Sequence, residues 1–197
     1  MFDDPGAHFA LSELLIVLAA VICAVKLGKA RMWLATSGSL LFGVIAAIGA
    51  FRFGSGEIDT LAQFHQSFSQ IGGVIALSLI TSQLLLISIY ARHQALLTLY
   101  GALTASAFVA FLVPAATMSL FLAWLAVAIL AAALLPAAIP RSRLFRALLV
   151  GVFLINITTV RQSSLLGVGL SWHVFHVLVA IWLACVSRII LEFRAKR

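Results

Sequence analysis

Charged residues are scarce in this chain of 197 residues, which is 63% hydrophobic and only 10% charged. A water-soluble domain of this size would not cover its surface with so few charged side chains. Apolar stretches of about 17–25 residues instead recur along the whole length, and each is long enough to span a ~30 Å hydrocarbon core as a helix. Because these stretches are continuously apolar rather than alternating, a transmembrane β-barrel is excluded. The sequence predicts an all-α integral membrane protein.

Seven apolar segments are expected to cross the membrane as helices of a single transmembrane domain, residues 1–197. The expected segments are 9–27, 32–51, 62–90, 94–113, 117–138, 143–160 and 170–190. Pro114, Pro136 and Pro140 mark the ends of the fourth and fifth segments. The connections are short, so we expect consecutive helices to be antiparallel neighbours.

Several common functional signatures are also missing. Cys23 and Cys185 are the only cysteines, and they form neither a CxxC pair nor an expected disulfide. The acidic start, `MFDDPGAHFA`, lacks the basic region of a cleavable signal peptide. No phosphate-binding glycine motif, nucleophile elbow or HExxH motif occurs. The last segment has no lysine for a retinal Schiff base, which disfavours a retinal protein.

The net charge of +7 is distributed unevenly between the two ends of the expected helices. Arg52 and Arg161 fall on one side, and the other 11 of the 13 basic residues fall on the opposite side. The positive-inside rule then places the N-terminus outside and the C-terminus in the cytoplasm, most simply in the inner (plasma) membrane of a bacterium. The basic residues are thus expected to set topology and contact anionic membrane lipids, and no nucleic-acid partner is expected.

Polar residues gather at the outer ends of the expected helices. His65 lies in `QFHQSFSQ`, and His173 and His176 lie in `SWHVFHVL`. Both segments enter the membrane from the same side, and positions i and i+3 share a helix face. Ionisable groups inside a membrane are functional hypotheses by default. We therefore predict that the three histidines bind zinc, with a fourth position left for water as in catalytic zinc sites.

Other outer residues are candidates for supporting roles. Asp59 and Glu13 are predicted as catalytic acids, able to act as general base or to orient a ligand histidine. Arg52, Gln66 and Ser69 are predicted to bind substrate, with Arg52 suited to an anion or headgroup. A weaker form of the metal site has two histidines and one carboxylate, such as Asp59 or Glu13.

The `SWHVFHVL` segment resembles the last helix of the superfamily of alkaline ceramidases, progestin/adiponectin receptors and hemolysin III proteins. In that superfamily the last helix carries HxxxH with an aromatic residue before the second histidine, as Phe175 precedes His176 here. Here the spacing is HxxH, and the stretch `GVIAAIGAFRFG` offers Arg52 in place of the family's second-helix serine and histidine. The resemblance implies seven helices, a zinc site and hydrolysis of lipid amides or esters.

Three functions follow from these observations. The first is a zinc-dependent hydrolase that acts on a lipid-like amide or ester from the outer leaflet. The second is a haem protein in which His65 faces His173 or His176 as axial ligands. The third is a non-catalytic, receptor-like protein that binds a lipid in an outer cavity.

Overall fold

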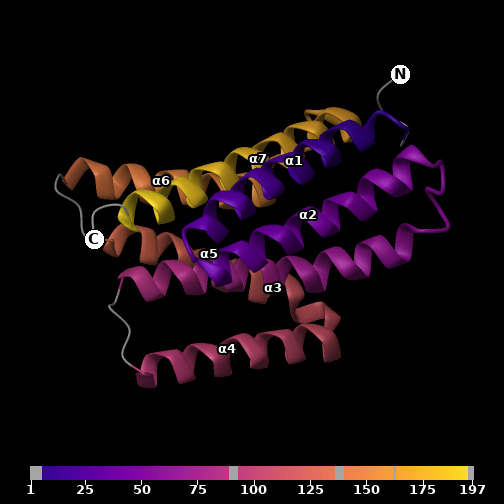
Figure 1. The fold of residues 1–197 in the computed structure, drawn as a ribbon. Helices are drawn as coiled ribbons and strands as arrows, with labels where there is room; N and C mark the ends of the chain where they lie inside the picture. The colour runs from indigo at the N-terminus through magenta and orange to yellow at the C-terminus, as the bar shows by residue number, and fades with distance from the viewer. Residues whose placement is uncertain (1–5, 89–92, 136–139, 162, 195–197) are drawn as a thin grey trace.

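The structure is a computed structural model that describes residues 6–88, 93–135, 140–161 and 163–194 (Figure 1). Its elements are α1 (Phe9–Lys29), α2 (Trp33–Gly54), α3 (Ala62–Ser88), α4 (His93–Leu112), η1 (Pro114–Ala116), α5 (Thr117–Leu134), α6 (Pro140–Ile155), η2 (Asn156–Val160) and α7 (Gly167–Arg194). The predicted all-α fold is confirmed, and the helices begin and end within a few residues of the expected segments wherever both are described. The expected ends at residues 90 and 138, Pro136 and the N-terminal acids lie outside the described residues.

Proline and glycine determine where several helices end. Pro114 begins the short 3-10 turn η1 directly after α4, because proline lacks the N–H that would continue the helix. The Thr117 hydroxyl donates a 2.8 Å hydrogen bond to the Pro114 carbonyl and so joins this turn to α5. Gly56 has φ +80°, a conformation that favours glycine, and it reverses the chain between α2 and α3.

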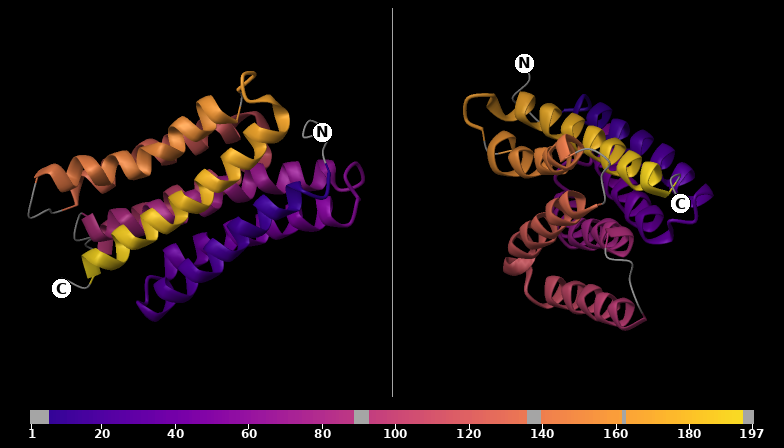
Figure 2. Two further views of the ribbon diagram at one scale, coloured as in Figure 1. Left: turned by 90° about the horizontal axis from the view of Figure 1, so that it is seen from above. Right: turned by 90° about the vertical axis from the view of Figure 1, so that its left-hand side faces the viewer.

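Six helices form a closed ring in which each packs against the next, in the order α1, α2, α3, α5, α6, α7 and back to α1. The helix α7 runs between α1 and α6, as Figure 2 shows from above. Across the ring, α3 and α7 touch only sparsely. The centre of the ring therefore has room for side chains and for a cavity.

The helix α4 lies outside this ring, packed mainly against α3 (Figure 1). The six ring helices, with η1 and η2 included, are long and apolar enough to cross a membrane. The described apolar part of α4, Leu99–Leu112, is shorter than such a span. The chain is thus an integral membrane protein by the length and composition of its helices, and a seventh crossing by α4 stays a prediction.

Small residues let α2 approach its neighbours closely. A Cβ atom at Gly38 would lie 2.6 Å from the Ala76 carbonyl oxygen of α3. A Cβ at Gly43 would lie 3.0 Å from the Ala20 Cβ of α1. Helices in membranes gain stability mainly from such close packing, since lipid is as apolar as the helix surface. The glycines of α2 thus let this helix pack closely against α3 on one side and α1 on the other.

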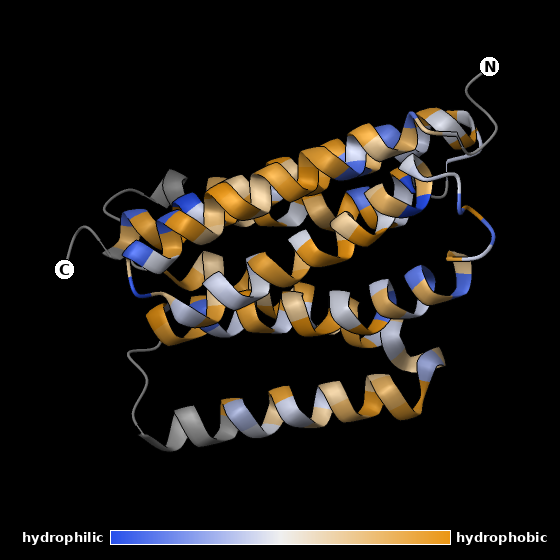
Figure 3. Ribbon diagram, turned by 45° about the vertical axis from the view of Figure 1, so that its right-hand side comes forward, coloured by the Kyte–Doolittle hydropathy of each residue, from blue (hydrophilic) through white to orange (hydrophobic). Residues whose placement is uncertain are grey.

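The two ends of the ring differ in content, and Figure 3 shows hydrophilic residues at both ends of an apolar middle. We call the end that carries Gly54, Ala62 and Gly167 the cavity end. The end that carries Lys29, Trp33 and Arg188 is the basic end. Apolar side chains, including Leu77, Leu84 and Leu183, fill the half of the ring nearer the basic end and are fully buried.

Candidate functional site

A cavity of about 730 Å³ occupies the cavity end of the ring. Residues of all six ring helices and of η2 line it. Its deeper part is apolar and includes Phe42, Phe121 and Phe153, and the Phe153 ring contacts the other two edge-on. Trp182 packs beneath Phe153 with ring centroids 4.5 Å apart and so closes the floor. Pockets of this volume and apolar character are typical binding sites for small molecules.

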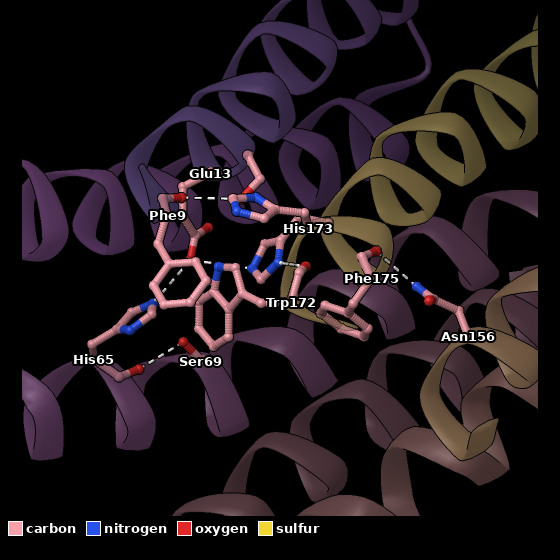
Figure 4. Close-up of polar contacts among 10 residues, drawn as sticks. Phe9, Glu13, His65, Ser69, Asn156, Trp172, His173 and Phe175 are labelled. Atoms are coloured by element: carbon pink, nitrogen blue, oxygen red, sulfur yellow. Dashed lines mark hydrogen bonds and ion pairs between the residues drawn. The ribbon is translucent and has the colours of Figure 1, made fainter. Parts of the chain in front are cut away.

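Glu13 of α1 is the centre of the polar part of this cavity. Its side chain is only 3% exposed. The Glu13 Oε1 atom lies 3.2 Å from His176 Nε2 of α7 and 4.0 Å from His65 Nε2 of α3 (Figure 4). Burying a carboxylate is costly unless it is paired, and a histidine pairs with it only through a proton on the facing Nε2 atom. Three helices that are distant in sequence thus converge on one carboxylate.

The backbone of α7 fixes the orientation of His176. Its Nδ1 atom lies 2.7 Å from the carbonyl oxygen of Trp172, which can only accept a hydrogen bond. The hydrogen of a neutral His176 is therefore on Nδ1, and Nε2 presents its lone pair to the cavity. Histidines that ligate metal ions are commonly held in this way, with the other ring nitrogen bonded to a carbonyl.

Gly49 of α2 makes room for the Glu13 cluster. A Cβ atom at this position would overlap the Glu13 carboxylate, 2.6 Å from its Cδ atom and 3.0 Å from His65 Nε2. The neighbouring atoms are the ends of side chains rather than backbone. Glycine at position 49 therefore leaves space for the Glu13 and His65 side chains, whereas Gly38 lets α2 approach the backbone of α3.

His173 faces away from this cluster. Its Nδ1 atom lies 3.2 Å from Ser12 Oγ, and its ring centroid lies 5.3 Å from that of His8 and 5.3 Å from that of Phe9. The Ser12 hydroxyl donates to the Phe9 carbonyl, so His173 is the donor to Ser12. The structure therefore joins His65 and His176 to Glu13 and places His173 in the contact between α1 and α7.

Of the other predicted site residues, three line the cavity and one does not. Asp59 is exposed in the turn before α3, away from the cavity lining, and so is not placed for the predicted catalytic role. Arg52, Gln66 and Ser69 line the cavity, as their predicted role requires. The Ser69 hydroxyl donates to the His65 carbonyl at 2.6 Å, and Arg52 Nε donates to the Ile58 carbonyl at 2.6 Å.

Arg161 also lines the cavity, and the sequence analysis did not assign it to the site. It follows η2, a π-helical turn, and its N–H bonds to the Asn156 carbonyl five residues earlier. The extra residue in such a turn changes the direction of the side chains that follow, and π turns are frequent at functional sites. The guanidinium lies 5.6 Å from the centre of the Phe175 ring. Burial lowers the pKa of Arg161, although an arginine stays charged in a protein.

The donor atoms of the cluster can be compared with the needs of a metal ion. Among the described residues, no group of three or more histidine, cysteine, aspartate or glutamate side chains is arranged to hold a metal ion, so the predicted three-histidine zinc site gains no support. Two tetrahedral zinc ligands with bonds of ~2.0–2.1 Å lie about 3.3–3.4 Å apart. The Glu13–His176 distance of 3.2 Å fits that spacing, and the Glu13–His65 distance of 4.0 Å exceeds it by about 0.6 Å. A movement of the His65 ring by about 0.6 Å would bring its Nε2 atom to ligand spacing from Glu13 Oε1.

Comparison with known proteins found no family model, curated protein or solved structure that matches this chain. The class of protein is therefore defined by the fold and the cavity alone. It is a helical membrane protein whose cavity combines an aromatic floor, a buried Glu13–His65–His176 cluster and two arginines.

Proposed function

We propose that this protein is a membrane-embedded hydrolase of a lipid-like amide or ester, with Glu13, His65 and His176 as its reactive centre. The observation that carries the proposal is the position of this cluster between the aromatic floor and the polar mouth of one cavity. A hydrocarbon chain on the floor would bring a polar linkage to the cluster. Such an amphiphile fits the combination of apolar walls and few convergent polar groups that binding pockets use.

Under this proposal the cluster holds a divalent metal ion such as zinc through two imidazole nitrogens and one carboxylate oxygen. Two histidines with one glutamate are a known ligand set for catalytic zinc. The ion would polarise the carbonyl and activate water. The Trp172 carbonyl keeps His176 Nε2 directed to the centre. Glu13 is the one carboxylate among the described residues of the lining, so under this proposal its second carboxylate oxygen would accept the proton of the water and pass it to the leaving group.

The membrane orientation of this site is part of the proposal. Described lysines and arginines gather at the basic end, where Lys26 and Lys29 close α1 and Arg188 lies near the end of α7. If this end faces the cytoplasm, as the positive-inside rule expects, the cavity opens towards the outer leaflet. A lipid-like substrate would then enter from that leaflet.

The test is hydrolysis by the purified protein in detergent or nanodiscs, supplied with zinc and a set of fatty amides and esters. We expect the wild type to release fatty acid and His176→Gln to lose activity by at least ~10²-fold, because a general acid–base or ligand residue contributes about that much. His173→Gln is the matched control, one turn away on the same helix, and should stay within a few fold of wild type. Equal activity of the two variants would contradict the proposal.

A non-catalytic lipid-binding protein is the second candidate, and one observation favours it. One proton shared between Glu13 Oε1 and His176 Nε2, which lie 3.2 Å apart, would satisfy both groups without any ligand or metal. In that case the wild type binds an amphiphile with no turnover and no bound metal. A haem receives no comparable support, because the Glu13 oxygen lies in contact with both His65 and His176, where the porphyrin would have to lie between axial ligands.

A further inference from the structure

Two arginines, Arg52 and Arg161, line the mouth of the cavity, and neither forms an ion pair with a described residue. Arg52 approaches from the end of α2, and Arg161 approaches from the end of η2. The helices α2 and α6 are on opposite sides of the ring. Among the described residues, neither guanidinium has a carboxylate within ion-pair distance, while Glu13 is engaged by two histidines. The mouth of the cavity therefore carries two positive charges that form no ion pair with a described acid.

Other polar groups near the mouth include hydrogen-bond donors. The Trp172 indole N–H is buried and has no hydrogen-bond partner among the described residues, and Trp172 lines the cavity. Ser163 and Ser164, which follow Arg161 closely, contribute hydroxyls to the same lining. A lining rich in donors and positive charge is complementary to an anion. Arginine is the side chain best suited to bind carboxylate, sulfate or phosphate oxygens through paired N–H groups.

The order of groups along α2 sets where such an anion would lie. Arg52 is three residues beyond Gly49, the residue beside Glu13, which corresponds to about 4.5 Å along a helix. Phe42 of the floor is ten residues before Arg52, or about 15 Å. From mouth to floor the cavity thus presents arginines, then the Glu13 cluster, then aromatic rings.

We propose that the cavity selects single-chain amphiphiles that carry an anionic group on the polar side of the reacting linkage, and that Arg52 and Arg161 bind this group together. This inference rests on the proposed function for the position of the linkage, but the selectivity for an anion follows from the arginines. The hydrocarbon chain lies on Phe42, Phe121 and Phe153. The anion lies about one helical turn nearer the mouth than Glu13.

The test measures binding rather than turnover, in nanodiscs of zwitterionic lipid. The probes are dodecyl phosphate, dodecylphosphocholine and inorganic phosphate, titrated into wild type and into Glu13→Gln, which removes the reactive carboxylate. We expect dodecyl phosphate to bind at least tenfold more tightly than dodecylphosphocholine in both proteins. Inorganic phosphate should compete only weakly, because it lacks the chain that contacts the floor.

Variants of the two arginines decide the assignment. Arg161→Gln and Arg52→Gln should each reduce dodecyl phosphate binding about tenfold and leave dodecylphosphocholine binding unchanged, and Arg161→Lys should retain part of the preference. Arg143→Gln, at an exposed position in the basic half of α6, is the matched control and should bind as the wild type does.

Three outcomes would overturn the inference: equal binding of the two dodecyl probes by the wild type, an Arg161→Gln loss that is equal for both probes, or full competition by inorganic phosphate. These outcomes are separable from failure of the hydrolase proposal. Preference for the anionic probe without any turnover supports the arginine assignment and removes only the enzyme. Turnover of neutral amphiphiles without a preference for the anionic probe supports the hydrolase proposal and removes the arginine assignment.

Discussion

The half of the ring at the cavity end and the half at the basic end are built from the same helices but filled in different ways. At the basic end, leucines and small residues such as Ala35 pack the interior, and the buried polar groups there are mostly hydroxyls, as in Ser39 and Ser187. At the cavity end, Glu13, His65 and His176 are buried beside open volume. Buried ionisable groups destabilise a fold unless they are paired, so the cavity end contributes less to stability than the closely packed basic end.

The difference is clearest in the glycines of α2. Gly38 lies in the basic half, where the obstacle to a larger residue is the α3 backbone. Gly49 lies in the cavity half, where the obstacle is the side chains of Glu13 and His65. The same residue type thus permits helix packing at one end and a site at the other, and substitutions at the two positions should separate stability from activity.

The largest effect on folding is expected from Gly38→Ala. The added methyl group would lie 2.6 Å from the Ala76 carbonyl oxygen and 2.8 Å from Ile80 Cγ1, so α2 and α3 must move apart. Overpacking of this kind typically costs about 1–3 kcal/mol. Thermal unfolding in detergent, followed by circular dichroism, should show a clear loss of stability. Gly101→Ala on α4 is the matched control, since a Cβ there meets open space. An unchanged midpoint for Gly38→Ala would mean that α2 and α3 are less closely packed than the structure has them.

The largest effect on activity without unfolding is expected from Glu13→Gln. The substitution keeps the shape of the side chain but removes its charge and its capacity to accept a proton. Hydrolysis should fall by at least ~10²-fold, the usual contribution of a general acid–base group. The unfolding midpoint should change little, because the lost interactions lie beside a cavity rather than in the packed half. Asp59→Asn is the control, since Asp59 is exposed, and a loss of activity as large as that of Glu13→Gln would show that the reactive acid is elsewhere.

Gly49→Ala should give an intermediate loss of activity. Its methyl group would displace the Glu13 carboxylate and press on His65 Nε2, while the helix itself favours alanine over glycine. We expect activity to fall by about tenfold or more, because a misplacement of ~1 Å at a reacting centre can cost up to ~10²-fold. Stability should remain within about 1 kcal/mol of wild type, or increase. Kinetic assays combined with unfolding curves would test this, and Gly49→Ala with full activity would contradict the placement of Glu13.

The smallest effect is expected from His173→Ala. His173 donates one hydrogen bond to Ser12 and packs against His8 and Phe9, so its removal should cost roughly 0.5–1.5 kcal/mol of stability. Activity and metal content should change by less than a few fold. A loss of bound metal in this variant would restore the three-histidine site that the sequence predicted.

Sequence reasoning predicted the helices well because apolar runs are local signals. The predicted segment 32–51 and the observed helix Trp33–Gly54 differ by only a few residues. The sequence also predicted that His65 and His176 lie near the same end of the bundle, because the helices that carry them both start at that end. Glu13 was one of the two carboxylates considered for a site of two histidines and one carboxylate. The structure places it between His65 and His176, on three different helices.

The remaining features depend on contacts between helices, which the sequence does not display. His173 lies three residues before His176 and is rotated from it by about 60° around the helix axis. Because of that rotation, His173 contacts Ser12 and Phe9 of α1, while His176 lines the cavity. Gly49 gave no signal, because it acts through the side chain it lacks. Arg161 stood out as one of two basic residues on the outer side, but the π turn before it is not visible in the sequence. Asp59 has the right chemistry, but its turn leaves it exposed.

The most direct test of the central claim is X-ray absorption spectroscopy at the zinc edge of the purified, zinc-loaded protein, together with metal stoichiometry. The account predicts one zinc per chain with two imidazole nitrogens and oxygen ligands at ~2.0–2.2 Å. Glu13→Gln and His176→Gln should each lose this zinc, and His173→Gln should keep it. A wild type that binds no more zinc than His176→Gln, or a zinc retained in both cluster variants, would contradict a metal centre built from Glu13, His65 and His176.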